Sequence, residues 1–84
     1  METSEIKRDY FDTNYFHLSK AFCNKGISHA GEGRFKEALE NFNKAIKVNP
    51  NNYIAYFYSA KIKIDLGDIE GAKTDFLSFD ILRK

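Results

Sequence analysis

The sequence repeats itself at an interval of 34 residues, and this periodicity limits the fold more than any other feature of the chain. Four positions carry the same residue in both copies: Ala21 and Ala55, Gly33 and Gly67, Ala38 and Ala72, Phe42 and Phe76. A fixed period of this kind is typical of repeat proteins, in which each copy is one unit that stacks on its neighbour. The frame divides the chain into residues 1–18, 19–52 and 53–84, and the last copy stops short of a full period.

Apolar and small residues predict two helices within each copy. In the first copy, Phe22, Gly26 and Ala30 recur at the helical spacing, and a second run of this kind extends from Phe35 to Ile46. The second copy repeats this plan. Small residues opposite aromatic rings are the arrangement that lets two helices pack closely. We therefore expect each copy to be a helical hairpin.

Glycine, proline and capping residues predict where these helices end. Gly33 and Gly67 interrupt the helical pattern, because glycine weakens a helix interior and favours the left-handed conformation found at helix ends. Pro50 cannot continue a helix, and Asn52 and Asp68 are good N-caps for the helices that follow. The prediction is an all-α fold of antiparallel helix–turn–helix repeats with about four helices.

Residues 1–18 form an N-terminal extension that also carries a helical pattern. Phe11, Tyr15, Leu18 and Phe22 follow one another at steps of four, three and four residues. We expect the first helix to begin near Asp12 or Thr13 and to continue into the first copy without a break. Phe11, Tyr15 and Phe16 are then expected to lengthen its packing surface.

Composition and charge exclude several classes of protein. With 84 residues the chain is at most one small domain, and 13 basic against 12 acidic residues give a net charge of +1. We therefore expect no nucleic-acid partner and no membrane association. No secretory signal is visible, and the single cysteine suits a reducing compartment, so the expected location is cytoplasmic.

The whole pattern resembles the tetratricopeptide repeat family. The first copy carries the resemblance at Phe22, Gly26, Gly33, Phe35, Ala38, Phe42, Ala45 and Pro50, and the second at Tyr56, Ala60, Gly67, Ile69, Ala72 and Phe76. About four-fifths of the chain is covered. The resemblance implies an antiparallel helical array that binds peptides or partner proteins on a concave side, lined by the first helix of each pair.

Carried onto this chain, the resemblance implies a set of partner-binding residues: Lys20, Asn24, Ile27, Ile54, Phe57, Tyr58 and Lys61. One subfamily grips the C-terminal carboxylates of heat-shock chaperones with Lys, Asn and Arg side chains. Cys23 and Ile27 stand where its first Lys and Asn would be, so only Asn24 fits that pattern. We do not expect a chaperone tail to be the ligand.

Three interpretations remain open for the apolar residues of the second copy. Ile54, Phe57, Tyr58 and Ile64 form a docking surface for a partner, pack within a homodimer, or are covered by the N-terminal segment. Phe79 stands where the first copy has Ala45, so it either forms an interface or turns inward. The residues expected to serve self-association are Phe76, Phe79 and Leu82.

No catalytic or metal-binding pattern is present in the sequence. Each of His17 and His29 lies six residues from Cys23, about 240° around a helix, so neither histidine shares a face with the cysteine. Gly31-Glu32-Gly33 lacks the Gly-Lys-Ser/Thr that follows in a phosphate-binding loop. We therefore expect no metal, no cofactor and no enzymatic activity.

The sequence thus predicts a protein–protein interaction module that binds a peptide or a partner protein on its concave face. The alternative is a structural module that assembles with itself through the apolar faces of the second repeat. The packing pattern does not account for three rings, those of Phe57, Tyr58 and Phe79, and we expect another chain to contact them.

Overall fold

The structure, a computed structural model, describes the backbone of residues 2–84 and the side chains of residues 15–84. It contains four helices: α1 (Glu2–Gly31), α2 (Phe35–Val48), α3 (Tyr53–Asp65) and α4 (Ile69–Leu82). No strand occurs in residues 2–84. The predicted all-α fold of four helices is therefore confirmed.

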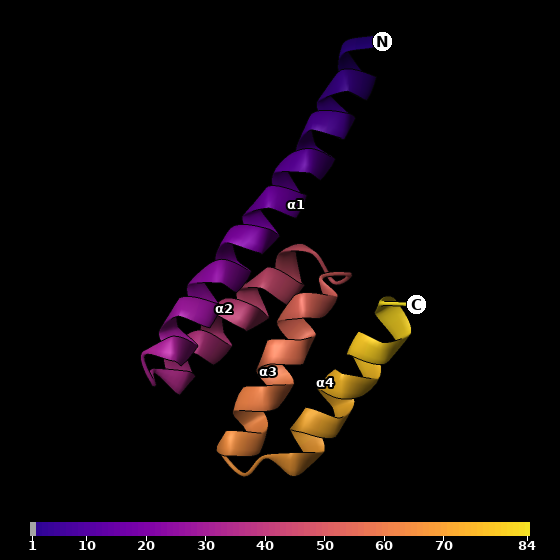
Figure 1. Cartoon of the computed structure of the whole chain (residues 1–84). Helices are drawn as coiled ribbons and strands as arrows, with labels where there is room; N and C mark the ends of the chain where they lie inside the picture. The colour runs from indigo at the N-terminus through magenta and orange to yellow at the C-terminus, as the bar shows by residue number, and fades with distance from the viewer. Residues whose placement is uncertain (1) are drawn as a thin grey trace.

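The helices form two antiparallel hairpins that lie side by side. Helix α1 packs on α2 and α3 packs on α4, while α3 also contacts α2 and, less extensively, α1. Helix α4 lies on the far side of α3 and packs against α3 alone among the described helices (Figure 1). The molecule is elongated, with principal extents of 51 × 27 × 15 Å.

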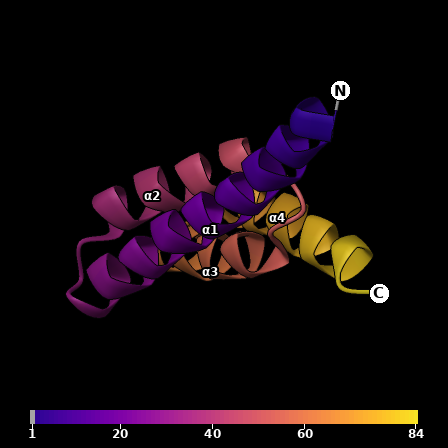
Figure 2. The same cartoon turned by 90° about the horizontal axis from the view of Figure 1, so that it is seen from above.

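Helix α1 is longer than predicted. It begins at Glu2 rather than near Asp12 or Thr13, because residues 2–25 contain no glycine or proline that would stop a helix. Its N-terminal half continues beyond the other helices (Figures 1 and 2). The expectation that Tyr15 and Phe16 extend the packing surface is wrong, since they are 54% and 60% exposed. The side chain of Phe11 lies outside the described residues.

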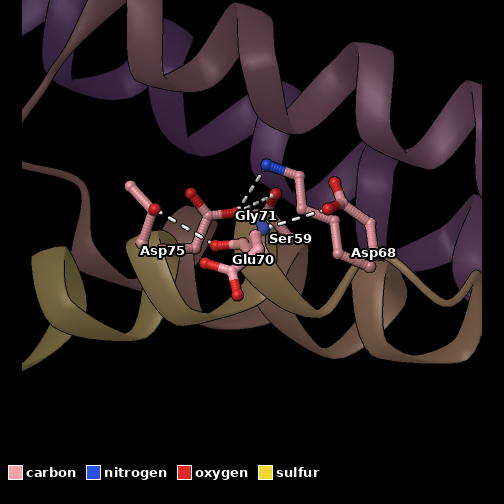
Figure 3. A network of polar contacts seen from close by, with 7 residues as sticks. Ser59, Asp68, Glu70, Gly71 and Asp75 are labelled. Atoms are coloured by element: carbon pink, nitrogen blue, oxygen red, sulfur yellow. Dashed lines mark hydrogen bonds and ion pairs between the residues drawn. The ribbon is translucent and has the colours of Figure 1, made fainter.

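The turns form as their residues predict. Gly33 and Gly67 adopt positive φ angles of 77° and 87°, the left-handed conformation that glycine accepts without strain. The side chain of Asn52 accepts a hydrogen bond from the Ala55 N–H at 3.3 Å and caps α3. Asp68 caps α4 by accepting from the Gly71 N–H at 3.0 Å (Figure 3).

Small residues allow the helices to approach closely, as the sequence indicates. Gly26 lies against the ring of Phe42, and a Cβ atom at residue 26 would come within 2.7 Å of that ring. Four alanines are completely buried in the interior: Ala38, Ala45, Ala55 and Ala60. Across the seam between the hairpins, the ring of Tyr58 stacks on Phe42 with their centroids 5.9 Å apart.

A buried polar network joins α3 to α4. The carboxylate of Asp75, only 7% exposed, accepts a hydrogen bond from the Ser59 hydroxyl at 2.7 Å. The same oxygen lies 2.8 Å from the Lys63 ammonium. Figure 3 shows Ser59 and Asp75 meeting between the two helices. Because a buried charge is costly without a partner, this pairing holds the two helices in one register.

Phe57, Tyr58 and Phe79, the three rings that the packing pattern does not account for, have contacts within the chain. The ring centroid of Phe57 lies 5.1 Å from that of Phe79 and 6.1 Å from that of Phe76. At the start of α3, the ring centroid of Tyr53 lies 5.9 Å from that of Phe79. Because Phe79 replaces a small residue at the end of the array, its ring reaches across to α3. All three rings are half-buried.

Candidate partner-binding groove

A hollow opens between α1, the start of α3 and the loop that joins α2 to α3. Its volume is about 270 Å³, and we call it the α1–α3 groove. Its lining residues are Phe16, Lys20, Cys23, Asn24, Asn49, Asn51, Asn52, Tyr53 and Ile54. Three of the seven predicted partner-binding residues, Lys20, Asn24 and Ile54, therefore come together in one place.

Three helices are tied together beneath this groove by a short chain of hydrogen bonds. The buried Ser19 hydroxyl donates to the Ala45 carbonyl oxygen at 2.7 Å, which joins α1 to α2. Asn52 donates from its side-chain amide to the Ser19 oxygen at 2.9 Å. Because Asn52 also caps α3, one side chain fixes the positions of α1 and α3 on either side of the hollow.

The groove combines apolar surface with amides and one cation. Ile54 is 42% exposed, and the exposed Lys20 is the only charged residue among the described residues of the lining. Asn24 and Asn51 are exposed, and each side-chain amide can both donate and accept a hydrogen bond. A chain segment with an apolar side chain, a free carboxylate group and backbone amides has the complementary chemistry.

Cys23 lines the α1–α3 groove, and its thiol has low reactivity. It is buried, and desolvation raises the pKa of its thiol above the ordinary value. The neutral thiol therefore dominates at neutral pH, and a neutral thiol is a poor nucleophile. Cys23 contributes apolar surface to the hollow.

Comparison with protein families matches residues 19–52 to the tetratricopeptide repeat. The matched segment contains residues 19–31 of α1, the whole of α2, and the loop that ends at the Asn52 cap. The chain belongs to the tetratricopeptide repeat family. Members of this family generally mediate interactions between proteins and are generally not enzymes.

A relative of the same family supports this assignment. Tetratricopeptide repeat protein 36 of Danio rerio is 38% identical to the chain over 65 residues, which are 77% of this chain and 35% of the relative. The chain thus spans about a third of the length of that curated relative. No solved structure matches the chain.

The other predicted partner-binding residues of the tetratricopeptide repeat chain lie outside the groove. Ile27 and Tyr58 are half-buried and pack against the core. Phe57 contacts the rings of α4, and the Lys61 ammonium lies 5.5 Å from the centroid of Phe57 and 6.0 Å from that of Tyr58. Ile27 lies on α1, and the other three residues lie on α3. In each helix they follow the residues that line the groove.

The residues predicted for self-association also have contacts within this tetratricopeptide repeat chain. Phe76, Phe79 and Leu82 are half-buried, and the first two contact Phe57. The most exposed apolar side chains of α4 are instead Leu77 and Ile81, at 62% and 60%. They lie four residues apart and therefore share one face of the helix.

Besides Cys23, five residues that line the groove are not among the predicted partner-binding residues: Phe16, Tyr53, Asn49, Asn51 and Asn52. Phe16 precedes the matched repeat, and the asparagines were interpreted only as turn and capping residues. The run Asn49-Pro50-Asn51-Asn52 indicates a loop, and loops often carry binding residues. This pattern could have identified the three asparagines as candidates.

The described residues contain no group of three His, Cys, Asp or Glu side chains placed to hold a metal ion. None of the described helices combines the length and the apolar character needed to cross a bilayer.

Proposed function

We propose that this tetratricopeptide repeat chain binds a peptide segment of a partner protein in the α1–α3 groove, without chemistry or a cofactor of its own. The observation that carries the proposal is that Lys20, Asn24 and Ile54, which are separated in sequence, line one open hollow. The peptide buries an apolar side chain against Ile54, places a carboxylate beside Lys20 and bonds its backbone to Asn24.

The remaining predicted partner-binding residues have supporting roles in this proposal. Lys61 is exposed on α3 and extends the positive charge along the path of the peptide. Ile27, Phe57 and Tyr58 hold α3 in position through their packing and present only part of their surfaces to the partner. We also propose a cytoplasmic location, because a single free cysteine suits a reducing compartment.

A library of synthetic peptides tests the proposal, with binding measured by fluorescence anisotropy. A peptide that binds the wild-type chain should bind the Ile54→Ser variant about tenfold more weakly, since burial of an isoleucine side chain contributes roughly 1.5–3 kcal/mol. Lys20→Glu should weaken acidic peptides most. Lys36→Glu is the matched control, because Lys36 is exposed on α2 and does not line the groove.

The outcome is decided by the difference between groove and control variants. Equal affinity of the wild-type, Ile54→Ser and Lys20→Glu chains for every bound peptide would show that the α1–α3 groove is not the binding site. Circular dichroism on each variant separates loss of binding from loss of helix.

Self-association through α4 is the second candidate function. The observation that favours it is the exposed pair Leu77 and Ile81 on a helix whose only described neighbour is α3. Sedimentation equilibrium at several concentrations should then show a dimer in the wild type and a monomer in the Leu77→Ser/Ile81→Ser variant. A wild-type chain that stays monomeric at the highest concentration excludes this candidate.

A further inference from the structure

A second hollow adjoins the α1–α3 groove. It has a volume of about 370 Å³ and is lined by Tyr15, Phe16, Val48, Asn49 and Asn51. Three of these residues, Phe16, Asn49 and Asn51, also line the α1–α3 groove. We call the second space the Tyr15–Val48 hollow. Because the two hollows share these lining residues, a single ligand can occupy both.

The Tyr15–Val48 hollow depends on a part of the chain that lies outside the matched repeat. Tyr15 and Phe16 belong to α1 and precede residue 19, where the match begins. Both rings are more than half exposed, although the helical pattern had predicted them to be packed. Two neighbouring aromatic rings left open beside a hollow are available for contact with a ligand.

The lining limits the chemistry of the occupant. Among the residues whose side chains the structure describes, no acidic residue lines either hollow, and Lys20 is the only cation. The ligand therefore carries an acidic group beside Lys20 and an apolar or aromatic group beside Tyr15. An extended peptide fits this arrangement, because alternate side chains of a strand point to the same side about 7 Å apart. Exposed amides at Asn24 and Asn51 can bond to its backbone.

We infer that the N-terminal extension supplies a second specificity subsite, in which the Tyr15–Val48 hollow takes an apolar side chain that flanks the segment bound in the α1–α3 groove. The inference rests on the proposed function and adds to it the class of ligand, an acidic extended peptide with an apolar flanking residue. In this subsite Tyr15 and Val48 contact the flanking residue, while Phe16, Asn49 and Asn51 line both positions.

The test uses N-acetylated, C-amidated peptides and the full chain. A hexapeptide library with one fixed Glu and one fixed Leu gives a parent peptide, which is lengthened by two residues at either end and finished with Phe or with Gly. We expect the Phe-ended peptide to bind the wild-type chain about five- to tenfold more tightly than the Gly-ended one. Anisotropy titrations measure this gain on each variant.

Three variants assign the gain to its site. Tyr15→Ala should abolish the difference between Phe-ended and Gly-ended peptides, because Tyr15 lines only the second hollow. Leu18→Ala is the matched control: Leu18 is an exposed residue of α1 that lines neither hollow, so the gain should persist. Ile54→Ala should weaken both peptides equally, because Ile54 lines only the first hollow.

The results separate the inference from the proposed function. If the parent peptide depends on Ile54 but the Phe gain is absent, or survives Tyr15→Ala, the second subsite is wrong and the groove assignment stands. If no library peptide binds, or the parent peptide binds Ile54→Ala as well as wild type, both are wrong.

Discussion

At Gly26 the packing of α1 on α2 leaves no room for a side chain. The ring of Phe42 occupies the space where a Cβ atom would lie. Gly31, near the end of the same helix, has no atom within 4 Å of the corresponding position. The two glycines therefore differ in a way that stability measurements can detect.

We predict that Gly26→Ala lowers the free energy of unfolding by about 1–3 kcal/mol, because the overpacked ring of Phe42 must move. Gly31→Ala should leave the stability unchanged or raise it by up to about 1 kcal/mol, since alanine favours the helix. Urea denaturation followed by circular dichroism gives both values. Equal effects of the two substitutions would contradict the close contact at Gly26.

Asp75 is expected to be the most sensitive polar residue of the second hairpin. Asp75→Ala leaves the Ser59 hydroxyl and the Lys63 ammonium without their acceptor, and both groups are largely buried. We predict a loss of about 2–3 kcal/mol in the free energy of unfolding. Asp80→Ala, which removes an exposed pair with Arg83, should cost less than about 1 kcal/mol. Similar losses in the two variants would contradict the buried network.

Cys23 should react slowly with alkylating reagents. Burial raises the pKa of its thiol, so the reactive thiolate is scarcer at a given pH than in an unfolded chain. We predict that the rate of reaction with iodoacetamide rises only at higher pH than for the urea-unfolded protein. A folded-state rate equal to the unfolded-state rate at pH 8 would contradict the buried position.

At the scale of the helices, Asn52 is a loop residue whose side chain bonds to two helices. It caps α3 and donates a hydrogen bond to Ser19 of α1. We predict that Asn52→Ala lowers the free energy of unfolding by about 1–2 kcal/mol. Asn51→Ala is the control and should change it by less than about 0.5 kcal/mol, because Asn51 is exposed. Thermal and urea unfolding of both variants test this difference.

The ends of the helices could be predicted from the sequence where a residue dictates them. Gly33 and Gly67 accept the left-handed backbone that these turns need, and Asn52 and Asp68 provide caps. The start of α1 could not be predicted in this way, because nothing in the extension stops a helix. In the groove, Lys20, Asn24 and Ile54 were predicted, since their positions follow from the repeat.

Other features depend on contacts between helices that a sequence pattern does not specify. The burial of Asp75 requires Ser59 and Lys63 to face it from another helix, and an aspartate within a helix usually indicates a solvent-facing position. Phe57 was assigned to an open face because a helical wheel does not include the neighbouring helix. Its partner Phe79 reaches it only across the seam between α3 and α4.

At the scale of the whole molecule, stability should fall from the first hairpin to the last helix. Helix α4 packs on α3 alone among the described helices, whereas α3 contacts α1, α2 and α4. In repeat proteins each unit depends on its immediate neighbours, so a helix at the end opens first.

We predict that amide hydrogens of α4 exchange faster than those of α2 and α3 under native conditions. Hydrogen exchange followed by mass spectrometry or NMR measures this order. Slower exchange in α4 than in α2 would contradict the order of opening, and would also indicate that another molecule covers α4.

Asn52 joins the wall of the groove to the support beneath it, and this has a consequence for genetic studies of the chain. A substitution at residue 52 changes both the folded fraction and the shape of the groove. Such a substitution is therefore pleiotropic. A mutational scan that selects only for partner binding will score residue 52 as a contact even when its amide never touches the ligand. Parallel selection for cellular abundance would separate the two traits, and positions such as Ile54 would then stand out as specific to binding.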